Sequence, residues 1–406
     1  MTRYGIVLLA FFASASAQAY TACTTKQIAG PGAHVAEEGA NPVTAGNYVY
    51  AAFSQDNNIG VAASSDYGRT IGAPVLIPDG TGPDMAVRLA AGYASVYALW
   101  VKRRADGYHS VFAASHDHGQ TWDTPIDFGL KRRGSLTQLS ADGANVHAAY
   151  LTDDGNITVR NSTDGGRSFS APVAVAPAAA EIVVTSYQQD VYLAWGIRDP
   201  KIEVMFAASH DGGRTFKVQN LTTHRPSGAN EPIFALDRLT GRLSLVWREN
   251  KPWQAVYVQS LDRGNTWSEP LILDAPARQV MVADDGTYIY VSYLKPIKLN
   301  GRFDYQIYVA VSADGGKAFG PAKNISGPTG VQNFDGDEQR PIPWVWDGHN
   351  SFNLSGVEAD GVHAWNGKNG HIWNSVFLGP GWLAAPARNS FVWEGPNSTV
   401  MYGHCD

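Results

Sequence analysis

SLDRGNTW, residues 260–267, is the clearest copy of an eight-residue unit that recurs along the chain. Each copy reads Ser-x-Asp-x-Gly-x-(Thr/Ser/Ala) and ends in an aromatic residue or Ile. The copies, called the repeat turns below, are 64–71, 115–122, 162–169, 209–216, 260–267 and 312–319. An Asp at a tight turn accepts backbone hydrogen bonds, and Gly supplies the positive φ that the turn needs. The pattern predicts a tight turn at each copy, with the terminal aromatic side chain folded back as a hydrophobic plug.

The segments between these turns predict short antiparallel strands. Strongly apolar second strands are expected at 48–53, 95–101, 145–151, 190–195, 242–247 and 288–294, because β-branched and aromatic residues favour strands. Third strands are expected at 109–115, 203–209, 255–260 and 306–312, and fourth strands at 73–77, 171–175 and 269–273. The turns recur roughly every 50 residues, and four short strands at that period describe one blade of a β-propeller. A β-sandwich or a set of small domains would not need one identical turn in every unit.

The number of blades follows from the repeat turns and from what comes after them. Six intact turns suggest six blades, but residues 320–406 follow the last one. Within them, SVFLGPGW (375–382) keeps the Ser, Gly and Trp of the repeat, with Phe377 in place of the Asp. Residues 361–366 and 371–377 are expected as its second and third strands. We therefore predict an all-β, seven-bladed propeller with six intact turns and one degenerate turn, and six blades as the alternative.

The two ends of the chain are expected to meet. KQIAGP (26–31) resembles KNISGP (323–328), the fourth strand of the sixth unit, which predicts that the N-terminal segment adds an outer strand to the last blade. Cys23 and Cys405 are the two cysteines of the chain, and in an exported protein such a pair indicates a disulfide. The alternative is a lipidated Cys23, for which Tyr20-Thr21-Ala22 is a poor context.

The N-terminus has the features of a signal peptide. Arg3 is followed by the apolar segment 5–13 and by the small-residue site Ala17-Gln18-Ala19. We expect residues 1–19 to be removed, and residues 20–406 to form one domain that is secreted or periplasmic, without a membrane span, and monomeric. A net charge of −6 argues against a nucleic-acid partner, which normally requires a strongly basic face.

The repeat turns resemble the Asp-box, or BNR, repeats of the sialidase-like superfamily of β-propellers, over nearly the whole mature chain. Such turns occur in sialidases, in other glycoside hydrolases, in polysaccharide lyases and in non-catalytic binding propellers, so the resemblance implies the fold more than the activity. It also implies that the repeat aspartates are structural residues and not catalytic carboxylates. These are Asp66, Asp117, Asp164, Asp211, Asp262 and Asp314.

The resemblance to sialidases also implies a set of catalytic residues. This set consists of an arginine triad for the sugar carboxylate, a Tyr/Glu nucleophile pair and an Asp acid/base. Residues 230–250 resemble the Glu-to-Arg stretch of that family and match Glu231 and Arg248. Asp84 stands where the acid/base could lie, and Arg302 or Arg340 could supply a later arginine. However, residues 20–63 contain no arginine for the first triad position, and no Tyr is assigned as nucleophile. The alternative is that Glu231 and Arg248 are ordinary residues near strand ends.

The expected ligand-binding face is the one opposite the repeat turns. It should carry the hairpins between second and third strands and the connections between blades, with WNGKNGH (365–371) among those hairpins. These loops hold slightly more Lys and Arg than Asp and Glu although the whole chain is acidic, which favours an anionic ligand. Candidate ligand-binding residues there are Arg104, Trp253, Trp344 and Trp346. Asp335, Asp337 and Glu338 are candidate calcium ligands, or else a solvated acidic loop.

Two functions are therefore expected. In the first, the propeller binds a glycan or an exported protein partner, of anionic character, on this face. In the alternative, it is a sialidase-like glycoside hydrolase or a polysaccharide lyase that acts on an acidic glycan. The incomplete arginine set and the missing nucleophile favour the first.

Overall fold

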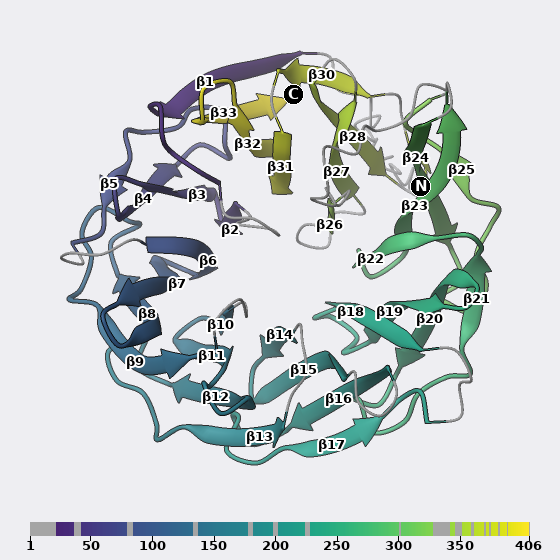
Figure 1. Ribbon diagram of the computed structural model, residues 1–406, viewed down its shortest axis with the longest axis horizontal. Helices are drawn as coiled ribbons and strands as arrows, with labels where there is room; N and C mark the ends of the chain where they lie inside the picture. Colours follow the sequence, from purple (N-terminus) through teal and green to yellow (C-terminus); the bar gives the residue numbers. More distant parts are fainter. Residues whose placement is uncertain are drawn as a thin grey trace, which may run out of the picture.

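The computed structural model describes residues 22–35, 42–78, 84–132, 137–177, 182–197, 202–223, 228–299, 302–327, 342–345, 351–358, 361–368, 371–372, 375–380, 382–387 and 389–405. In these ranges the chain forms β-strands and no helix. The strands make eight antiparallel sheets that stand around a central opening (Figure 1). In each sheet the first strand lies nearest the opening and the last strand lies at the circumference, which is the architecture of a β-propeller.

The first four sheets follow the chain in order, one blade after another. Blade 1 contains β2 (Val43–Ala45), β3 (Tyr48–Gln55), β4 (Asn58–Ser64) and β5 (Val75–Leu76). Blade 2 contains β6 (Asp84–Gly92), β7 (Ser95–Arg104), β8 (Gly107–Ser115) and β9 (Ile126–Lys131). Blade 3 contains β10 (Gln138–Asp142), β11 (Asn145–Leu151), β12 (Asn156–Ser162) and β13 (Val173–Pro177). Blade 4 contains β14 (Ile182–Tyr187), β15 (Asp190–Ile197), β16 (Glu203–Ser209) and β17 (Lys217–Asn220).

The other four sheets complete the ring, and the last one combines both ends of the chain. Blade 5 contains β18 (Ala229–Leu236), β19 (Leu243–Asn250), β20 (Trp253–Ser260) and β21 (Leu271–Asp274). Blade 6 contains β22 (Arg278–Asp284), β23 (Ile289–Leu299), β24 (Arg302–Ser312) and β25 (Lys323–Asn324). Blade 7 contains β26 (Ile342–Val345), β27 (Ser351–Glu358), β28 (Gly361–Lys368), β29 (His371–Ile372) and β30 (Val376–Gly379). Blade 8 contains β31 (Trp382–Ala387), β32 (Ser390–Gly395), β33 (Thr399–Cys405) and β1 (Cys23–Ala29).

The expected strands are present in blades 1 to 6, but the prediction of seven blades is wrong by one. The segment 375–382 is not a degenerate repeat turn, because its central residues form β30 and pair with β28. Residues 361–366 and 371–377 belong to the third and fourth strands of blade 7, and not to its second and third. Blades 7 and 8 lack the eight-residue turn in the sequence, so a count based on that turn finds one blade where there are two sheets.

The different strand assignment in blade 7 also places one predicted loop on the other face of the ring. The repeat turns join third to fourth strands in blades 1 to 6, and that side is called the repeat-turn face. The opposite side, called the loop face, carries the hairpins between second and third strands. Because β28 is a third strand, its end at Lys368 and the start of β29 at His371 lie on the repeat-turn face. The prediction that this hairpin lies on the loop face is therefore wrong.

The repeat turns have one hydrogen-bond pattern in all six copies. In 260–267 the Ser260 hydroxyl donates to the Asp262 carboxylate at 2.8 Å and accepts from the Gly264 N–H at 2.8 Å. The Thr266 N–H and hydroxyl both donate to Asp262, at 2.8 and 2.6 Å. The other five turns repeat the bonds to the Ser hydroxyl and the backbone bond to the Asp. The six aspartates therefore stabilise the repeat turns through these hydrogen bonds.

The terminal aromatic residue of a repeat turn packs against the preceding blade. Trp267 of blade 5 meets Phe206 of blade 4 edge-on, with ring centroids 4.9 Å apart. Phe319 of blade 6 meets Tyr257 of blade 5 at the same separation. These side chains act as the predicted plugs, and they fill the space between neighbouring sheets.

Acid should weaken the repeat turns. Hydrogen bonds from the Thr266 hydroxyl and then from its N–H lower the pKa of Asp262 from 3.8 to about 2. A carboxyl whose folded pKa is depressed stabilises the fold above its unfolded pKa and loses that contribution as pH falls through the folded value. We expect the free energy of unfolding to fall less steeply from pH 4 to pH 2 in Asp262→Asn than in the wild type, as measured by urea denaturation. Equal slopes would contradict this assignment.

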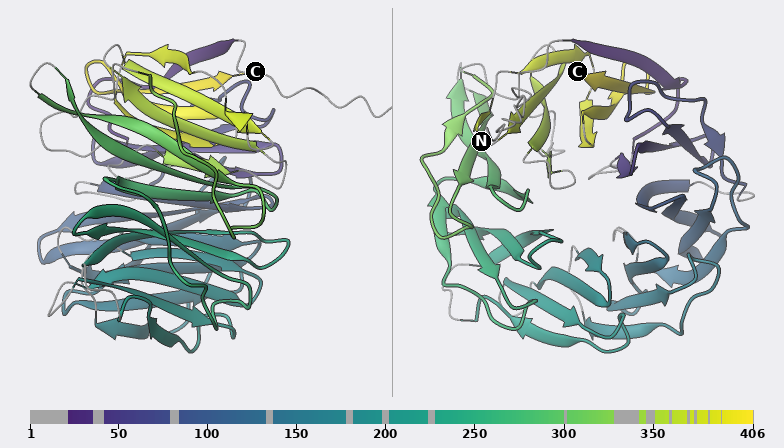
Figure 2. Two further views of the ribbon diagram at one scale, coloured as in Figure 1. Left: turned by 90° about the vertical axis from the view of Figure 1, so that its right-hand side faces the viewer. Right: turned by 180° about the vertical axis from the view of Figure 1, so that it is seen from behind.

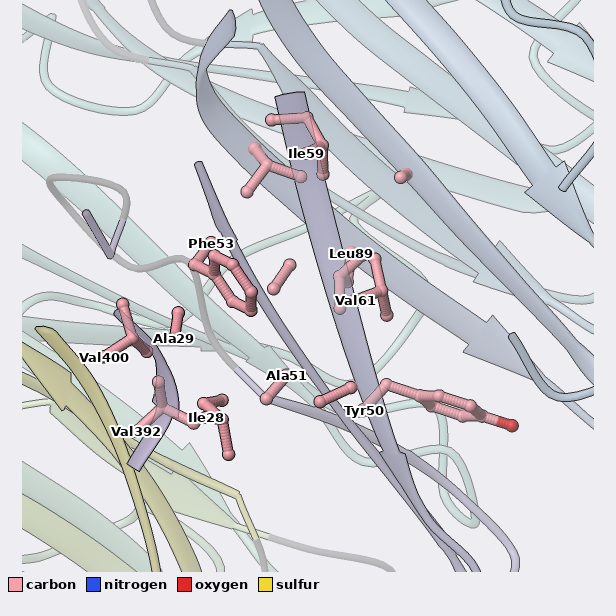
Figure 3. Close-up of a cluster of buried hydrophobic side chains, with 14 of the residues drawn as sticks. Ile28, Ala29, Tyr50, Ala51, Phe53, Ile59, Val61, Leu89, Val392 and Val400 are labelled. Carbon is pink, nitrogen blue, oxygen red and sulfur yellow. The ribbon is translucent and has the colours of Figure 1, made fainter. Parts of the chain in front are cut away.

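The two ends of the chain meet in blade 8, as predicted. Strand β1 pairs with β33, with Cys23 opposite Cys405, and the two cysteines form a disulfide. Figure 3 shows Ile28 and Ala29 of β1 packed with Val392 and Val400 of blade 8 and close to Phe53 of blade 1. The first and last segments of the chain therefore share one hydrophobic core.

Polar contacts also join neighbouring blades on the repeat-turn face. Arg242 of blade 5 makes a two-point ion pair with Asp284 of blade 6, with N–O distances of 2.6 and 2.8 Å. The Tyr402 hydroxyl of blade 8 donates to the Gly68 carbonyl of blade 1 at 2.7 Å. These bonds link neighbouring blades around the ring, including the last to the first.

Candidate functional site

Glu231 and Arg248, the sequence-predicted catalytic pair, lie together near the loop face of blade 5. The Arg248 guanidinium is 3.0 Å from a Glu231 carboxylate oxygen, and the side chains are 12% and 13% exposed. Glu231 is in the innermost strand β18, and Arg248 is in its neighbour β19. The pair is therefore a compact, mostly buried ion pair at the inner side of the blade, where the charge of Arg248 is compensated by Glu231.

Glu231 is at a β-bulge whose two-against-one offset recurs in the innermost strands β6, β22 and β31 of three other blades. In β18, residues 231–232 stand opposite the single residue Trp247, and Glu231 has φ +56°. Ala86 in β6 and Gln279 in β22 occupy the equivalent bulges, with φ of +53° and +47°. Left-handed backbone in non-glycine residues costs of order 1–3 kcal/mol, and such strain and bulges both concentrate next to functional sites. The bulges lie at the start of innermost strands, where the loop face meets the central opening (Figure 1).

An aromatic and cationic cluster lies next to these bulges, between blades 5 and 6. Trp253 opens strand β20, Arg278 immediately precedes the bulge residue Gln279, and Tyr305 is in β24. The guanidinium carbon of Arg278 is 3.6 Å from the centroid of the Trp253 ring, and its Nη1 donates to the Tyr305 hydroxyl at 2.9 Å. Trp253 remains 37% exposed. The three side chains, called the Trp253 cluster, offer an aromatic surface and a fixed positive charge at the loop face.

A second set of contacts borders this cluster. Both Asp274 carboxylate oxygens accept from Lys295 Nζ at 3.0 Å, and one accepts from the Tyr293 hydroxyl at 2.6 Å. Burial, followed by the bond to Asp274, raises the pKa of the Tyr293 phenol well above its ordinary value. Tyr293 therefore stays protonated at neutral pH, and the Asp274–Lys295 pair fixes the chain segment that leads to Arg278.

Arg104 is not part of this site. It lies in blade 2, on the far side of the ring from blades 5 and 6 (Figure 1), and its Nε is 3.0 Å from Asp127. His109 joins the same group, with its two ring nitrogens 3.0 Å from Asp127 and from Asp106. Arg104 pairs with the outer strand of its own blade, and its role in ligand binding remains a prediction.

Several predicted site residues are not tested by the described side chains. Asp84, Arg302 and Trp344 are placed by backbone alone, at the starts of β6 and β24 and within β26. Arg340, Trp346, Asp335, Asp337 and Glu338 lie outside the described residues. Their roles remain predictions.

The ranges that the structure covers contain no group of three or more His, Cys, Asp or Glu placed to hold a metal ion. No helix long and apolar enough to cross a membrane occurs in the same ranges.

The sequence did not indicate Arg278, Gln279 or Tyr305. Arg278 is in an ordinary blade-to-blade connection, and its partners come from other strands of blades 5 and 6. The bulges with positive φ carry Ala, Glu and Gln, so no shared residue type marks them. A Trp or Tyr stands opposite each of the three, but Trp195 in blade 4 has no bulge opposite it. A Trp or Tyr in the second strand therefore does not by itself predict a bulge in the strand opposite.

The comparisons with known proteins agree on the fold. No protein-family model matches the chain, and no curated protein sequence matches it. A solved ulvan lyase of polysaccharide lyase family PL25, bound to -[GlcA(1-4)Rha3S]-, is 11% identical, with a TM-score of 0.53 over 87% of this chain and 97% of that one.

Two weaker structural matches have TM-scores under 0.5 and carry no argument. The β-propeller domain of the Trilobed protease from Pyrococcus furiosus is 9% identical, with a TM-score of 0.49 over 80% of this chain and 94% of that domain. The Hadza microbial sialidase Hz136 is 15% identical, with a TM-score of 0.39 over 75% of this chain and 70% of that one. At 11% identity the ulvan lyase match shows a shared fold alone, and the site must be interpreted from its own residues.

Proposed function

We propose that the chain is an exported, Asp-box propeller of the sialidase-like superfamily that binds an acidic glycan at the Trp253 cluster. The observation that carries the proposal is the exposed indole of Trp253 beside the Arg278 guanidinium at the loop face. An exposed indole face stacks on the apolar face of a sugar ring, and a planar guanidinium pairs with a carboxylate at two points. The two groups together match a sugar that carries a carboxylate.

Export is supported by the leader-like segment 1–19 and by the disulfide, since such bonds persist in oxidising compartments. The fold similarity to an ulvan lyase bound to a glucuronate-containing glycan also supports a glycan as the ligand. A secreted or periplasmic protein would meet such polymers outside the cytoplasm.

Trp253→Ala should weaken binding of a glucuronate-containing oligosaccharide by about 5- to 12-fold, because loss of a stacking contact costs roughly 1–1.5 kcal/mol. Isothermal titration calorimetry of the mature protein is the measurement. Tyr93→Ala is the matched control, since Tyr93 is 85% exposed on the repeat-turn face and should leave the affinity unchanged. If the folded wild type binds no acidic oligosaccharide, the proposed function is wrong.

A polysaccharide lyase is the second candidate, and the Arg278–Tyr305 contact favours it. Arg278 could neutralise a uronate carboxylate while the Tyr305 phenol carries a proton. In such an elimination the C5 proton is removed, the C4–O4 bond breaks, a C4=C5 double bond forms, and O4 is protonated. Ultraviolet absorbance of the unsaturated product would reveal turnover, and Tyr305→Phe should abolish it. Binding without any product restricts the protein to the first function.

Hydrolysis of a sialoside is less well supported by the site. The alternative relies on Arg248 as a carboxylate-binding residue, but Glu231 already pairs with Arg248 at 3.0 Å. An incoming carboxylate would have to replace Glu231.

A further inference from the structure

A buried histidine connects blades 3 and 4 near the repeat-turn face. His147, the third residue of β11, is 2% exposed, and its Nδ1 lies 2.8 Å from Asn161 Oδ1 in the adjacent strand β12. The side-chain amide of Asn161 donates to the Gly213 carbonyl at 2.8 Å. Gly213 belongs to the repeat turn 209–216 of blade 4. The three residues, called the His147 junction below, therefore link this turn to the preceding blade.

The hydrogen bonds of the junction fix the tautomer of His147. A backbone carbonyl only accepts, so Asn161 presents its NH₂ group to Gly213 and its carbonyl oxygen to His147. Nδ1 must therefore donate, and in the neutral ring Nε2 carries no hydrogen. Nε2 is buried and has no hydrogen-bond partner among the residues that the structure describes. A proton on Nε2 would add a buried charge without an acceptor, which is strongly unfavourable.

The charged groups of blade 3 do not compensate such a proton. Asp142 is the last residue of β10, and its charge favours the protonated form of His147. However, Asp142 already accepts from the Gln188 N–H at 2.7 Å and pairs with Arg238 at 3.6 Å. Arg160 of β12 points toward blade 2 instead. Movement of Asn161 toward blade 4 is also blocked, because its side chain lies directly against the Gly213 backbone.

The acids of blade 4 are engaged in other contacts. The Asp211 carboxylate accepts hydrogen bonds within its own repeat turn. Asp190, the first residue of β15, pairs with Arg263 and His210. On β14, the Tyr187 ring lies under a guanidinium of blade 5. Within the described part of both blades, no carboxylate is therefore available to hold a protonated His147 in place.

Burial is the main influence on the pKa of His147, and it lowers this pKa below the ordinary value of 6.5. The bond to Asn161 and the charge of Asp142 act in the opposite direction and are the smaller effects. A solvated histidine therefore takes up a proton more readily than the buried one. The junction is fully stable above about pH 6.5, and it loses stability as the pH falls below that value.

We infer that the His147 junction is an acid-sensitive contact, which opens when His147 takes up a proton and turns to solvent. Opening breaks the bond to Asn161, which then no longer holds its amide against Gly213. The two blades loosen at this point of the ring, and the repeat turn 209–216 loses part of its support. The inference concerns the repeat-turn face and is independent of the glycan site proposed on the loop face.

Blades 1, 2 and 4 build the same position without a histidine. The third residue of their second strand is a Tyr, and an Ala stands opposite it in the third strand. The pairs are Tyr50–Ala63, Tyr97–Ala114 and Tyr192–Ala208. In blade 3, His147 and Asn161 replace this pair. A phenol titrates near pH 10, so among these four blades the acid-sensitive pair is specific to blade 3.

Amide hydrogen exchange, measured by mass spectrometry at pH 7.0 and pH 5.5 and corrected for intrinsic exchange rates, tests the inference. Protection of residues 209–216 in the wild type should fall several-fold at the lower pH. The limit is about 10-fold per pH unit for an opening linked to one proton. The repeat turn 312–319 of blade 6 is the internal control, because it packs against Tyr257 and Gln259. Its protection should not change.

Two variants remove the titrating group in different ways. His147→Gln keeps a donor for Asn161, and His147→Tyr with Asn161→Ala copies the residue pair of blades 1, 2 and 4. In both variants, protection of 209–216 should be the same at pH 5.5 as at pH 7.0. Circular dichroism at pH 7.0 establishes that they are folded, and the double variant serves as the test if His147→Gln does not fold.

Two results would overturn the inference. One is a wild type in which residues 209–216 are equally protected at both pH values. The other is a folded variant without His147 that loses as much protection in acid as the wild type does, since another group would then be responsible. Neither result depends on whether the protein binds a glycan, so failure of the proposed function and failure of this inference are distinguishable.

Discussion

Removal of the Cys23–Cys405 disulfide is expected to lower the free energy of unfolding by about 4–5 kcal/mol. The bond joins residues 382 positions apart, so it closes nearly the whole described chain into one loop. By loop-closure entropy, a cross-link of this length restricts the unfolded chain strongly, although the effect grows slowly with length. Guanidinium denaturation of the wild type and of the Cys23→Ser/Cys405→Ser double variant would measure the difference.

The folded structure should survive the loss of this bond. Strand β1 also pairs with β33 along its length, and Ile28 and Ala29 pack into the core shared by blades 8 and 1. The double variant should therefore keep the near-ultraviolet circular dichroism of the wild type while its unfolding midpoint falls. Adding reductant to the wild type should shift the midpoint equally and leave the double variant unchanged. Identical midpoints in oxidised and reduced wild type would contradict the prediction.

Asp284→Ala is expected to destabilise the protein by about 3–5 kcal/mol, because it leaves the Arg242 guanidinium buried without its counter-ion. The Asp284 side chain is fully buried, and that of Arg242 is 9% exposed. The carboxylate also accepts from the Ser244 hydroxyl at 3.1 Å and from the Gly286 N–H at 3.0 Å. The bond to Asp284 is the main cause that raises the pKa of Arg242, so this residue stays charged.

Replacing both members of the pair should cost much less than replacing Asp284 alone. Arg242→Met with Asp284→Leu removes the buried charges together, and such exchanges are often close to neutral. Urea denaturation of the two single variants and the double variant gives the coupling energy in a double-mutant cycle. If the changes in the free energy of unfolding of the two single variants add up to that of the double variant, Arg242 and Asp284 are not coupled and the prediction is wrong. The partly exposed pair Arg238 and Asp142, 3.6 Å apart, is a control for which we expect a smaller effect.

Part of the fold could be predicted because the repeat turn is a local structure. In SLDRGNTW the Ser, Asp, Gly and Thr bond to one another within seven residues, so the same letters give the same turn in all six copies. The apolar strands between the turns then define four-stranded units. The pairing of Cys23 with Cys405 also followed from the sequence, because the chain contains no other cysteine.

The blade count could not be predicted in the same way. Blades 7 and 8 have no repeat turn in the sequence, so the repeat does not mark them. Blade 8 also takes its outer strand from residues 23–29, at the other end of the sequence. A count based on one local motif misses sheets that are stabilised by packing and by pairing between distant segments.

The sequence by itself thus determined the four-stranded blade, its repeat turn, the aromatic residue that packs between blades, and the pairing of the two chain ends. It also predicted Glu231, Arg248 and Trp253 as site residues, and all three lie in blade 5. The tertiary structure decided that Glu231 compensates Arg248, that Arg104 belongs elsewhere, and that Trp253 is joined by Arg278 and Tyr305. The physical reason is that a repeat turn is stabilised by contacts within one segment, whereas the site forms where two blades pack together.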